Sequence, residues 1–187
     1  EKELEPLSHA LQNVKGLVAR TLDELGMNDF DARFYLSPAS GKTFRYDIAT
    51  TRPYKGNRDR SHRPTYEQEI RDYIHKNWET YVAVNEEADD LLGIEQTKLG
   101  DDSVIISLDK DLDQIAGPKY NFSHRIAYSV SEEEAYYNLH MQMLTGDSTD
   151  NIPGLPRIGA GKAAKALHGF ETEQGQMEEV IHMYQVH

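Results

Sequence analysis

The sequence predicts an α/β fold in which a mainly parallel central sheet is flanked by helices, with a smaller helical region after it. Short apolar runs rich in β-branched residues alternate with amphipathic patterns, and the clearest such run is 104–108. Beyond Ser131 the pattern becomes helical and is punctuated by Gly and Pro. We therefore expect an α/β domain over residues 1–131 and a helical region over 132–187.

The elements of the first half follow from periodicity and turn residues. Leucine and valine recur at three- and four-residue steps from Leu7 to Leu25, which predicts a helix with Gly26 as its C-cap. A short strand is expected at 32–36, followed by a turn over 37–42. The segment 43–48 is ambiguous and is a strand candidate.

The remaining elements are predicted in the same way. Helices are expected from Thr65 to about Trp78, over 87–99, over 132–144 and from Lys162 onwards. Strands are expected at 80–84, 104–108 and 126–130. No motif is recognised in 170–187.

Composition excludes several classes of protein. The chain contains no cysteine, so disulfides, zinc–thiolate sites and cysteine catalysis are absent, and a reducing cytoplasm is the expected compartment. No signal peptide and no apolar run long enough to cross a membrane are found, so we expect no membrane association. A monomer is expected.

The net charge of −12 argues against nucleic-acid binding, but the charge is segregated. Between Arg52 and Arg63 only Asp59 is acidic, while the basic residues of this stretch are Arg52, Lys55, Arg58, Arg60 and Arg63. We predict a flexible basic segment that contacts phosphate.

Acidic residues cluster at three places, two of them directly after predicted strands. These clusters are Glu87/Asp89/Asp90, Asp109/Asp111 and Asp147/Asp150. Carboxylates gathered at the carboxyl ends of strands repel one another unless a cation lies between them. Oxygen ligands of this kind suit Mg²⁺ or Mn²⁺, and two such ions can drive phosphodiester hydrolysis. The alternative for any single cluster is a set of solvated loop residues or helix caps.

The motifs built on these clusters resemble those of the 5′→3′ exonuclease and flap-endonuclease family, which includes phage 5′ exonucleases and the 5′-nuclease domains of bacterial DNA polymerases. The resemblance covers roughly residues 44–168, and a bacteriophage member is the best match. Four motifs occur in the family's order: Arg52-Pro-Tyr54-Lys55-Gly-Asn-Arg58, Glu87-Ala-Asp89-Asp90, Ser107-Leu-Asp109-Lys-Asp111 and Gly146-Asp147-Ser-Thr-Asp150-Asn-Ile-Pro153-Gly154.

The resemblance implies a PIN-like 5′-nuclease fold with a two-metal site. One ion would use Glu87, Asp89 and Asp90. The other would use Asp111, Asp147 and Asp150, with Asp109 between the two. Lys55 and Arg58 would contact the scissile phosphate from a basic arch over about 50–78, through or beneath which single-stranded DNA passes.

The segment 152–164 resembles the family's helix–three-turn–helix, which grips duplex DNA through main-chain amides and often binds K⁺. Gly159 and Gly161 would allow close approach of the backbone, and Lys162 would supply charge. Further DNA contacts are expected from Arg52 and Tyr54. A stacked Tyr54 and a partly buried Tyr54 are both open.

The sequence departs from the family in two places. Family members begin with a strand that carries a metal-binding Asp, and we expect this first strand upstream of Glu1. A second family Asp follows the next strand, where this chain has Ser37 and Pro38.

Several functions remain open. The first is a divalent-metal-dependent nuclease that acts on DNA with 5′ ends, flaps or junctions, in the host cytoplasm if the source is a phage. The second is a catalytically incomplete, structure-specific DNA-binding module. A PIN-type ribonuclease and activity on RNA–DNA hybrids are further alternatives.

Overall fold

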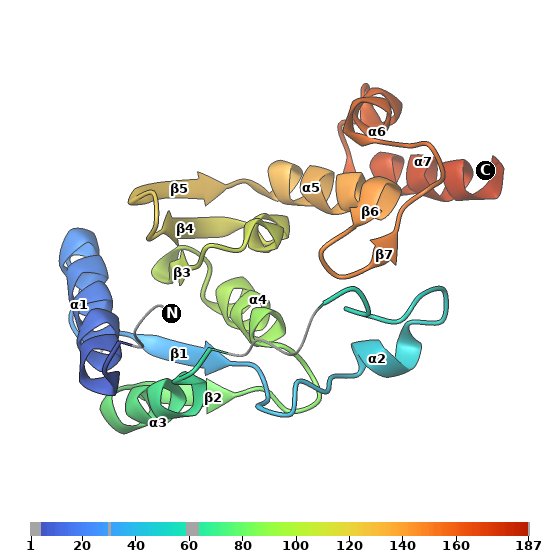
Figure 1. Cartoon of the computed structure of the whole chain (residues 1–187). Helices are drawn as coiled ribbons and strands as arrows, with labels where there is room; N and C mark the ends of the chain where they lie inside the picture. Colours follow the sequence, from blue (N-terminus) through green and yellow to red (C-terminus); the bar gives the residue numbers. More distant parts are fainter. Residues whose placement is uncertain (1–4, 30, 59–63, 187) are drawn as a thin grey trace.

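The computed structural model describes residues 5–29, 31–58 and 64–186 (Figure 1). The helices are α1 (Leu7–Leu25), α2 (Arg45–Ile48), α3 (Glu67–Asn77), α4 (Ala88–Leu99), α5 (Glu132–Thr145), α6 (Ala160–Leu167) and α7 (Glu173–Val186). The strands are β1 (Arg33–Leu36), β2 (Glu79–Val82), β3 (Ile105–Ile106), β4 (Gly117–Asn121), β5 (Ile126–Val130), β6 (Gly146–Asp147) and β7 (Ile152–Pro153). Two 3₁₀ turns, η1 (Gly100–Asp102) and η2 (Lys110–Gln114), complete the chain order.

The strands form small separate sheets. β1 and β2 pair in parallel, β3 pairs in parallel with β4, and β4 pairs antiparallel with β5. β6 and β7 make a short antiparallel pair. The expected single, mainly parallel central sheet is therefore not formed within the described ranges, because no hydrogen bonds join β1 to β3.

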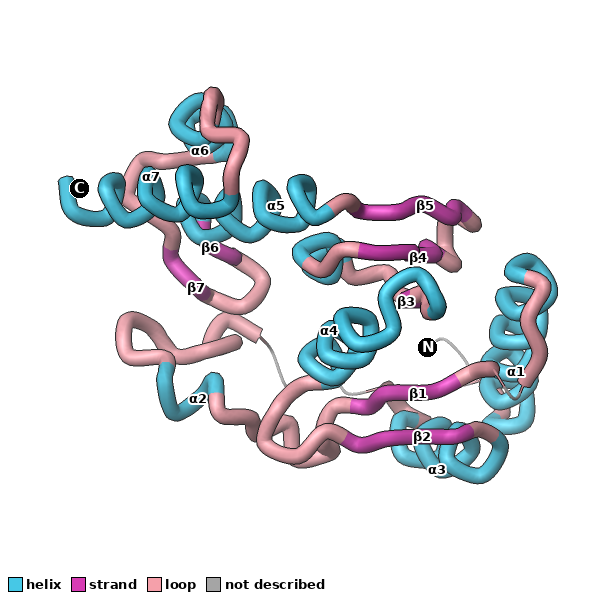
Figure 2. The backbone as a smooth tube through the Cα atoms, turned by 180° about the vertical axis from the view of Figure 1, so that it is seen from behind, coloured by secondary structure: helices cyan, strands magenta, loops and turns pink. Residues whose placement is uncertain are grey.

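Helices link the two larger sheets. α4 packs against β1 and against the η1 turn that precedes β3, and both views show it near these elements (Figures 1 and 2). α1 contacts the second sheet, because Glu24 of α1 accepts a hydrogen bond from the Tyr120 hydroxyl of β4 and forms an ion pair with Arg125. α3 packs beside β2 and α1, and the rings of Phe34 and Trp78 are 5.1 Å apart.

The helical region has its own apolar core. Its buried members are Leu144, Leu155, Ala163, Leu167 and Val180, which come from α5, the loop before α6, α6 and α7. A capping box fixes the start of α5, since Ser131 Oγ accepts from the Glu134 amide and the Glu134 carboxylate accepts from the Ser131 amide.

Most expected elements are found, with instructive exceptions. α1 ends at Gly26, which takes the left-handed conformation at φ 68°. The strand candidate 43–48 is wrong, because 45–48 forms a short helix. The strand at 104–108 shrinks to two residues, and β4 and α7 were not anticipated.

Across the described ranges, no helix combines the length and apolar character that a membrane crossing requires.

Candidate metal and nucleic-acid site

The basic segment is docked on the loop that follows β6. The Lys55 amide donates to the Asp150 carbonyl at 2.9 Å. Two side-chain amides add reciprocal links, since Asn57 Nδ2 donates to the Ser148 carbonyl at 2.7 Å and Asn151 Nδ2 donates to the Pro53 carbonyl at 2.8 Å. The expectation of a flexible segment is thus wrong for 53–58. Asp59, Arg60 and Arg63, which also belong to that expectation, lie outside the described residues.

The turn within this segment depends on backbone that few residues adopt. Lys55 has φ 52°, in the left-handed region. A Cβ on Gly56 would lie 2.9 Å from the Pro53 carbonyl oxygen, so only glycine fits without a shift. The turn directs the Lys55 side chain back toward the acidic residues, while Arg52 stays exposed on the surface.

Both predicted catalytic cations contact the predicted metal ligands. Lys55 Nζ lies 2.6 Å from Glu87 Oε1 and 3.8 Å from Asp150 Oδ2. Arg58 Nη2 lies 2.6 Å from Asp150 Oδ1. These contacts bring together residues of three motifs that are far apart in the sequence, and the Lys55 side chain is 15% exposed. The cations occupy positions next to the carboxylate oxygens, where they offset the negative charge.

Tyr54 lies between the same two carboxylates. Its hydroxyl oxygen is 2.7 Å from Asp150 Oδ2 and 3.0 Å from Glu87 Oε2, and it donates to one of them at a time. The residue is 4% exposed, and its ring packs edge-on against Tyr46 at 5.2 Å. The buried alternative is therefore the right one, and the assignment of Tyr54 to base stacking is wrong. Burial raises the pKa of Tyr54, and the charge of the nearby carboxylates adds to the effect.

Electrostatic effects show that the acidic motifs influence one another. Asp89 is an exposed residue, but the atoms around its carboxylate partly desolvate it. This desolvation raises the pKa of Asp89 to about 6, and the charges of Asp109 and Glu87 add to the shift. Burial also raises the pKa of Asp111, and the charges of Asp109 and Asp147 add to it. The fold thus concentrates negative charge from all three clusters.

The remaining carboxylates have local hydrogen bonds. Asp109 Oδ1 accepts from the Asp111 amide at 2.9 Å, and Asp147 Oδ1 accepts from the Thr149 amide at 2.8 Å. Asp111 Oδ1 accepts from Gln142 Nε2 of α5 at 3.0 Å. No group of three or more Asp, Glu or His side chains in the described ranges is already arranged closely enough to hold a metal ion.

The chemistry of the donor set nevertheless suits a hard divalent cation. All of the donors are carboxylate oxygens. Desolvation raises the pKa values of Asp89 and Asp111, the charges of neighbouring carboxylates add to the effect, and a cation would stabilise the ionised forms. A groove of about 670 Å³ opens beside Asp89 and Asp90 and runs along α4 past Gly93, with Phe44 and Ile115 among its lining residues.

Asp90 is held by an arginine that the sequence did not single out. Arg45 Nη2 and Nη1 lie 2.6 Å from Asp90 Oδ1 and Oδ2, respectively. Asp90 Oδ2 also accepts from the Glu87 amide at 2.8 Å. The Arg45 guanidinium keeps the pKa of Asp90 below its usual range.

Ser37 occupies a structural position at the start of α4. Its hydroxyl accepts from the Ala88 amide at 3.0 Å, while its carbonyl accepts from Arg71 of α3 at 2.7 Å. The Ser37 side chain therefore reaches the start of α4, next to the acidic residues there.

The predicted duplex-binding residues lie elsewhere, at α6. Figure 1 places α6 away from α2 and the basic segment, on the far side of the β6–β7 hairpin. Gly159 is the N-cap of α6, and a Cβ on Gly159 or Gly161 would meet no atom within 4 Å. Lys162 Nζ lies 3.0 Å from the Arg157 carbonyl. The space in front of the helix start is therefore open.

Three kinds of residue were missed from the sequence. No sequence signal marks Arg45, because its partner Asp90 lies 45 positions away and the contact depends on the folded structure. Asn57 and Asn151 do lie inside the quoted motifs, which is a usable signal. Gln142 is on the helix α5, where it also accepts from Gln114 at 2.6 Å, and no pattern marks it.

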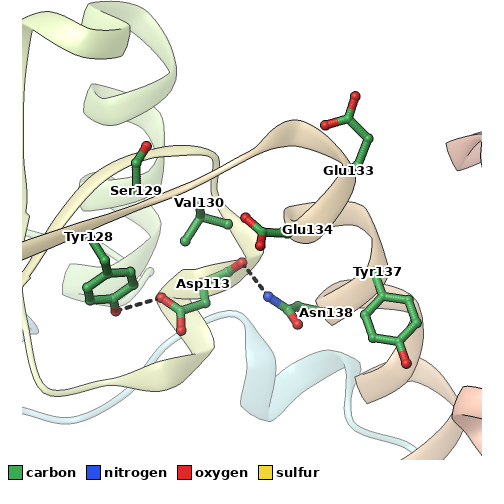
Figure 3. A pocket seen from close by; sticks show the side chains of 8 residues that line it. All are labelled: Asp113, Tyr128, Ser129, Val130, Glu133, Glu134, Tyr137 and Asn138. Carbon is green, nitrogen blue, oxygen red and sulfur yellow. Dashed lines mark hydrogen bonds between the residues drawn. The ribbon is translucent and has the colours of Figure 1, made fainter.

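A second pocket lies apart from the acidic clusters (Figure 3). It is lined by Asp113, Tyr128, Ser129, Val130, Glu133, Glu134, Tyr137 and Asn138, none of which was a predicted site residue. Asp113 accepts from the Tyr128 hydroxyl at 2.8 Å and, through its carbonyl, from Asn138 at 3.0 Å. Asp113 thus links η2 to β5 and α5.

Known proteins resemble this chain in sequence and in fold. DNA polymerase I of Bacillus subtilis is 30% identical over 164 residues, which cover 76% of this chain and 18% of that protein. A 5′-3′ exonuclease of Buchnera aphidicola is 34% identical over 98 residues, which cover 46% of this chain and 34% of that protein. No family model matches the chain.

Solved structures share the fold. A bacteriophage T5 flap endonuclease, solved as a pseudo-enzyme–product complex with DNA and metal ions, superposes with a TM-score of 0.61 at 17% identity over 97% of this chain and 82% of that one. The sequence relatives are matched over less than half of their own length. The resemblance that the four motifs predict is confirmed by these likenesses, and the chain is related to the 5′→3′ exonuclease and flap-endonuclease family.

Proposed function

We propose that this chain is the greater part of a divalent-metal-dependent nuclease that hydrolyses DNA at 5′ ends or flaps. The observation that carries the proposal is the meeting of Lys55 and Arg58 with Glu87 and Asp150. Metal-dependent phosphodiester hydrolysis uses side-chain cations to contact the phosphate and carboxylates to bind the metal. In this chain the two kinds of side chain lie next to each other. The T5 flap endonuclease of the same fold was solved with DNA and metal ions.

The acidic residues would hold the metal. Glu87, Asp89 and Asp90 would serve one ion, and Asp111, Asp147 and Asp150 would serve the other, with Asp109 between the two. When bound, Mg²⁺ or Mn²⁺ supplies an activated water and neutralises charge on the phosphate. Lys55 and Arg58 would exchange their carboxylate partners for the phosphate oxygens, which are equally good acceptors for charged donors.

The start of α6 would hold the duplex. Backbone amides at a helix N-terminus suit phosphate, and Gly159 and Gly161 leave open space around it. We assign this region, 132–187, as the DNA-binding part of a monomer, with Lys162 as a supporting charge. Backbone carbonyls of this element would hold K⁺.

We also propose that a further strand completes the sheet. β1 is paired on one edge by β2, and β3 is paired on one edge by β4, within the described ranges. A strand between β1 and β3 would join the two sheets into the expected mainly parallel one. It would bring the acidic residue that the family carries at its end to the site beside Asp89.

Cleavage of a 5′-flap DNA substrate tests the function. The full-length protein is incubated with the labelled substrate in Mg²⁺, in Mn²⁺ and in EDTA, and an RNA–DNA hybrid is assayed in parallel. We expect cleavage of the flap with either metal and none in EDTA. Cleavage in EDTA, or cleavage of RNA alone, would sink the proposal.

Asp111→Asn provides the matched variant. The amide keeps the size of the side chain and can still accept from Gln142, but it loses the charge that a metal needs. We expect the cleavage rate to fall by at least about 100-fold while affinity for the flap DNA changes less than about twofold. An equal loss in Asp101→Asn, whose residue lies in η1 outside the acidic clusters, would show that the effect is not specific to the site.

A catalytically incomplete DNA-binding module is the second candidate, and Ser37 favours it. Its hydroxyl lies where the family has a carboxylate and is occupied by the Ala88 amide. Calorimetric titration with Mn²⁺ separates the two candidates. Tight flap binding without Mn²⁺ binding would favour the module.

A further inference from the structure

Arg45 and Asp90 form a part-buried pair beside the acidic site. Both guanidinium contacts are 2.6 Å long, and the two side chains are 29% and 22% exposed. Two parallel N–H···O bonds of this kind fix the relative orientation of both groups, which a single contact does not. α2, which carries Arg45, is thereby joined to the first turn of α4.

Asp90 uses both of its oxygens within the chain. Oδ1 accepts from Arg45 Nη2, while Oδ2 accepts from Nη1 and from the Glu87 amide at 2.8 Å. The residue thus links Arg45 to the backbone of Glu87, and Glu87 begins α4 as its N-cap. Both oxygens of Asp90 thus serve contacts that hold the start of α4 in place.

The backbone around Arg45 is itself anchored. The Phe44 amide donates to the Asn85 carbonyl at 2.8 Å, and the Arg45 guanidinium lies 4.8 Å from the centre of the Phe44 ring. Asn85 has φ 60°, so the chain between β2 and α4 is bent at the point where α2 contacts it. Arg45 is therefore a rigid support on the side of α4 that carries the acidic residues.

We propose that Arg45 is a positioning residue: by holding both oxygens of Asp90, it fixes the start of α4 and presents Glu87 and Asp89 to a divalent cation, while Asp90 itself does not bind the metal. This inference rests on the proposed function. It reassigns Asp90 from ligand to support. Partners that orient metal ligands in this way typically change metal affinity by about 10- to 100-fold when removed.

A double-mutant cycle with Mn²⁺ as the probe tests the inference. The full-length protein, Arg45→Met, Asp90→Asn and the double variant are titrated with Mn²⁺ by calorimetry at a temperature where circular dichroism shows all four folded. We expect each single variant to bind Mn²⁺ about tenfold more weakly and the double variant to bind no more weakly than the worse single variant. Arg45→Lys should recover part of the affinity, since one contact to Asp90 is restored.

Controls separate the possible outcomes. Arg33→Met removes a half-exposed, single-contact arginine–carboxylate pair, Arg33–Glu79, which joins the first residues of β1 and β2, and should leave Mn²⁺ affinity unchanged. Additive losses in the double variant would show that Arg45 and Asp90 act independently, and a far larger loss in Asp90→Asn than in Arg45→Met would show that Asp90 binds the metal directly. Either result would overturn the inference alone. A wild-type protein that binds no Mn²⁺ would overturn the proposed function together with the inference.

Discussion

The hydroxyl of Tyr54 connects two acidic motifs that come from distant parts of the chain. It lies within hydrogen-bond distance of Glu87 and Asp150, while the ring is enclosed and packed against Tyr46. The hydroxyl is thus the part of Tyr54 that bears on the site, and the ring is part of the core.

Tyr54→Phe isolates that hydroxyl. The ring contacts remain, but one hydrogen bond to a carboxylate is lost, so we expect the free energy of unfolding to fall by about 1–2 kcal/mol. Urea unfolding measures the change, and fluorescence anisotropy with flap DNA provides the second readout. An unchanged DNA affinity would show that the hydroxyl makes no contact with DNA, and an unchanged free energy of unfolding would contradict its role in joining the two motifs.

Asp89 gives the site a pH dependence. Its pKa is about 6 in the folded chain and its ordinary value is 3.8, so the folded chain binds more protons than the unfolded one between these values. The contribution of Asp89 to the metal-free stability therefore falls as the pH rises through this window. Mn²⁺ requires the ionised form and should bind about tenfold more weakly per pH unit below 6.

Calorimetric Mn²⁺ titrations from pH 5 to pH 8 measure this effect. Asp89→Asn should abolish binding of the Mn²⁺ ion that Asp89 holds. It should also remove the contribution of Asp89 to the pH dependence of the free energy of unfolding. Asp101→Asn is the control and should change neither. An affinity that is flat between pH 5 and pH 7 would contradict the raised pKa.

At the scale of elements, the start of α6 leaves open space around the backbone of Gly161. Nothing in the fold requires glycine at 161, because a Cβ there meets no atom within 4 Å. Alanine favours helices over glycine, so Gly161→Ala should raise the free energy of unfolding by about 0.5–1 kcal/mol. If phosphate approaches this backbone, the same change should weaken binding of duplex DNA.

Gly16→Ala is the matched control for that experiment. Gly16 lies within α1, its Cβ position is equally open, and α1 has no predicted DNA contact. We expect the same gain in stability from Gly16→Ala without a change in duplex affinity, measured by urea unfolding and anisotropy. Equal affinities for both variants would argue against α6 as the duplex-binding element.

Local patterns predicted the elements well where periodicity is strong and failed where it is not. α1 shows one apolar stripe and a terminal glycine, and both of its ends were found. β4 begins with Gly117-Pro118, a pair that is typical of turns, so its sequence does not indicate a strand. The strand depends on pairing with β3 and β5, which the local sequence does not show. α7 has weak amphipathic character, and packing of Gln176 and Val180 against α5 and α6 stabilises it.

The site followed the same rule. Acidic motifs were found because carboxylate spacing is visible in one segment. The pairs Arg45–Asp90 and Asn57–Ser148 were not, because each joins segments whose proximity depends on the whole fold. Tyr54 could be interpreted in two ways until its burial was known.

At the scale of the whole molecule, stability is divided between two regions. One apolar core lies among α5, α6 and α7, with Leu144, Leu167 and Val180 almost fully enclosed. α1 and the β-sheets enclose other residues, such as Leu22 and Ile105. We therefore expect the helical region to open separately from the α/β domain.

Leu167→Ala tests this division. The residue is 2% exposed, and its truncation should lower the free energy of unfolding by about 2–5 kcal/mol. Native-state hydrogen exchange should then show faster exchange in α5, α6 and α7 and little change in β1 and β2. Leu22→Ala is the converse control, with loss of protection in α1 and not in α7. Equal effects everywhere would indicate a single cooperative unit.

The docking of 53–58 on the loop after β6 also affects how the chain folds. The hydrogen bonds that make this contact join residues separated by 91 to 98 positions in the sequence. Such contacts close large loops and lose much chain entropy, whereas helices such as α1 and α5 need only local contacts. We therefore expect the helices to form early and the basic turn to join its acidic loop among the last steps, so that a newly made chain acquires its secondary structure before it acquires its site.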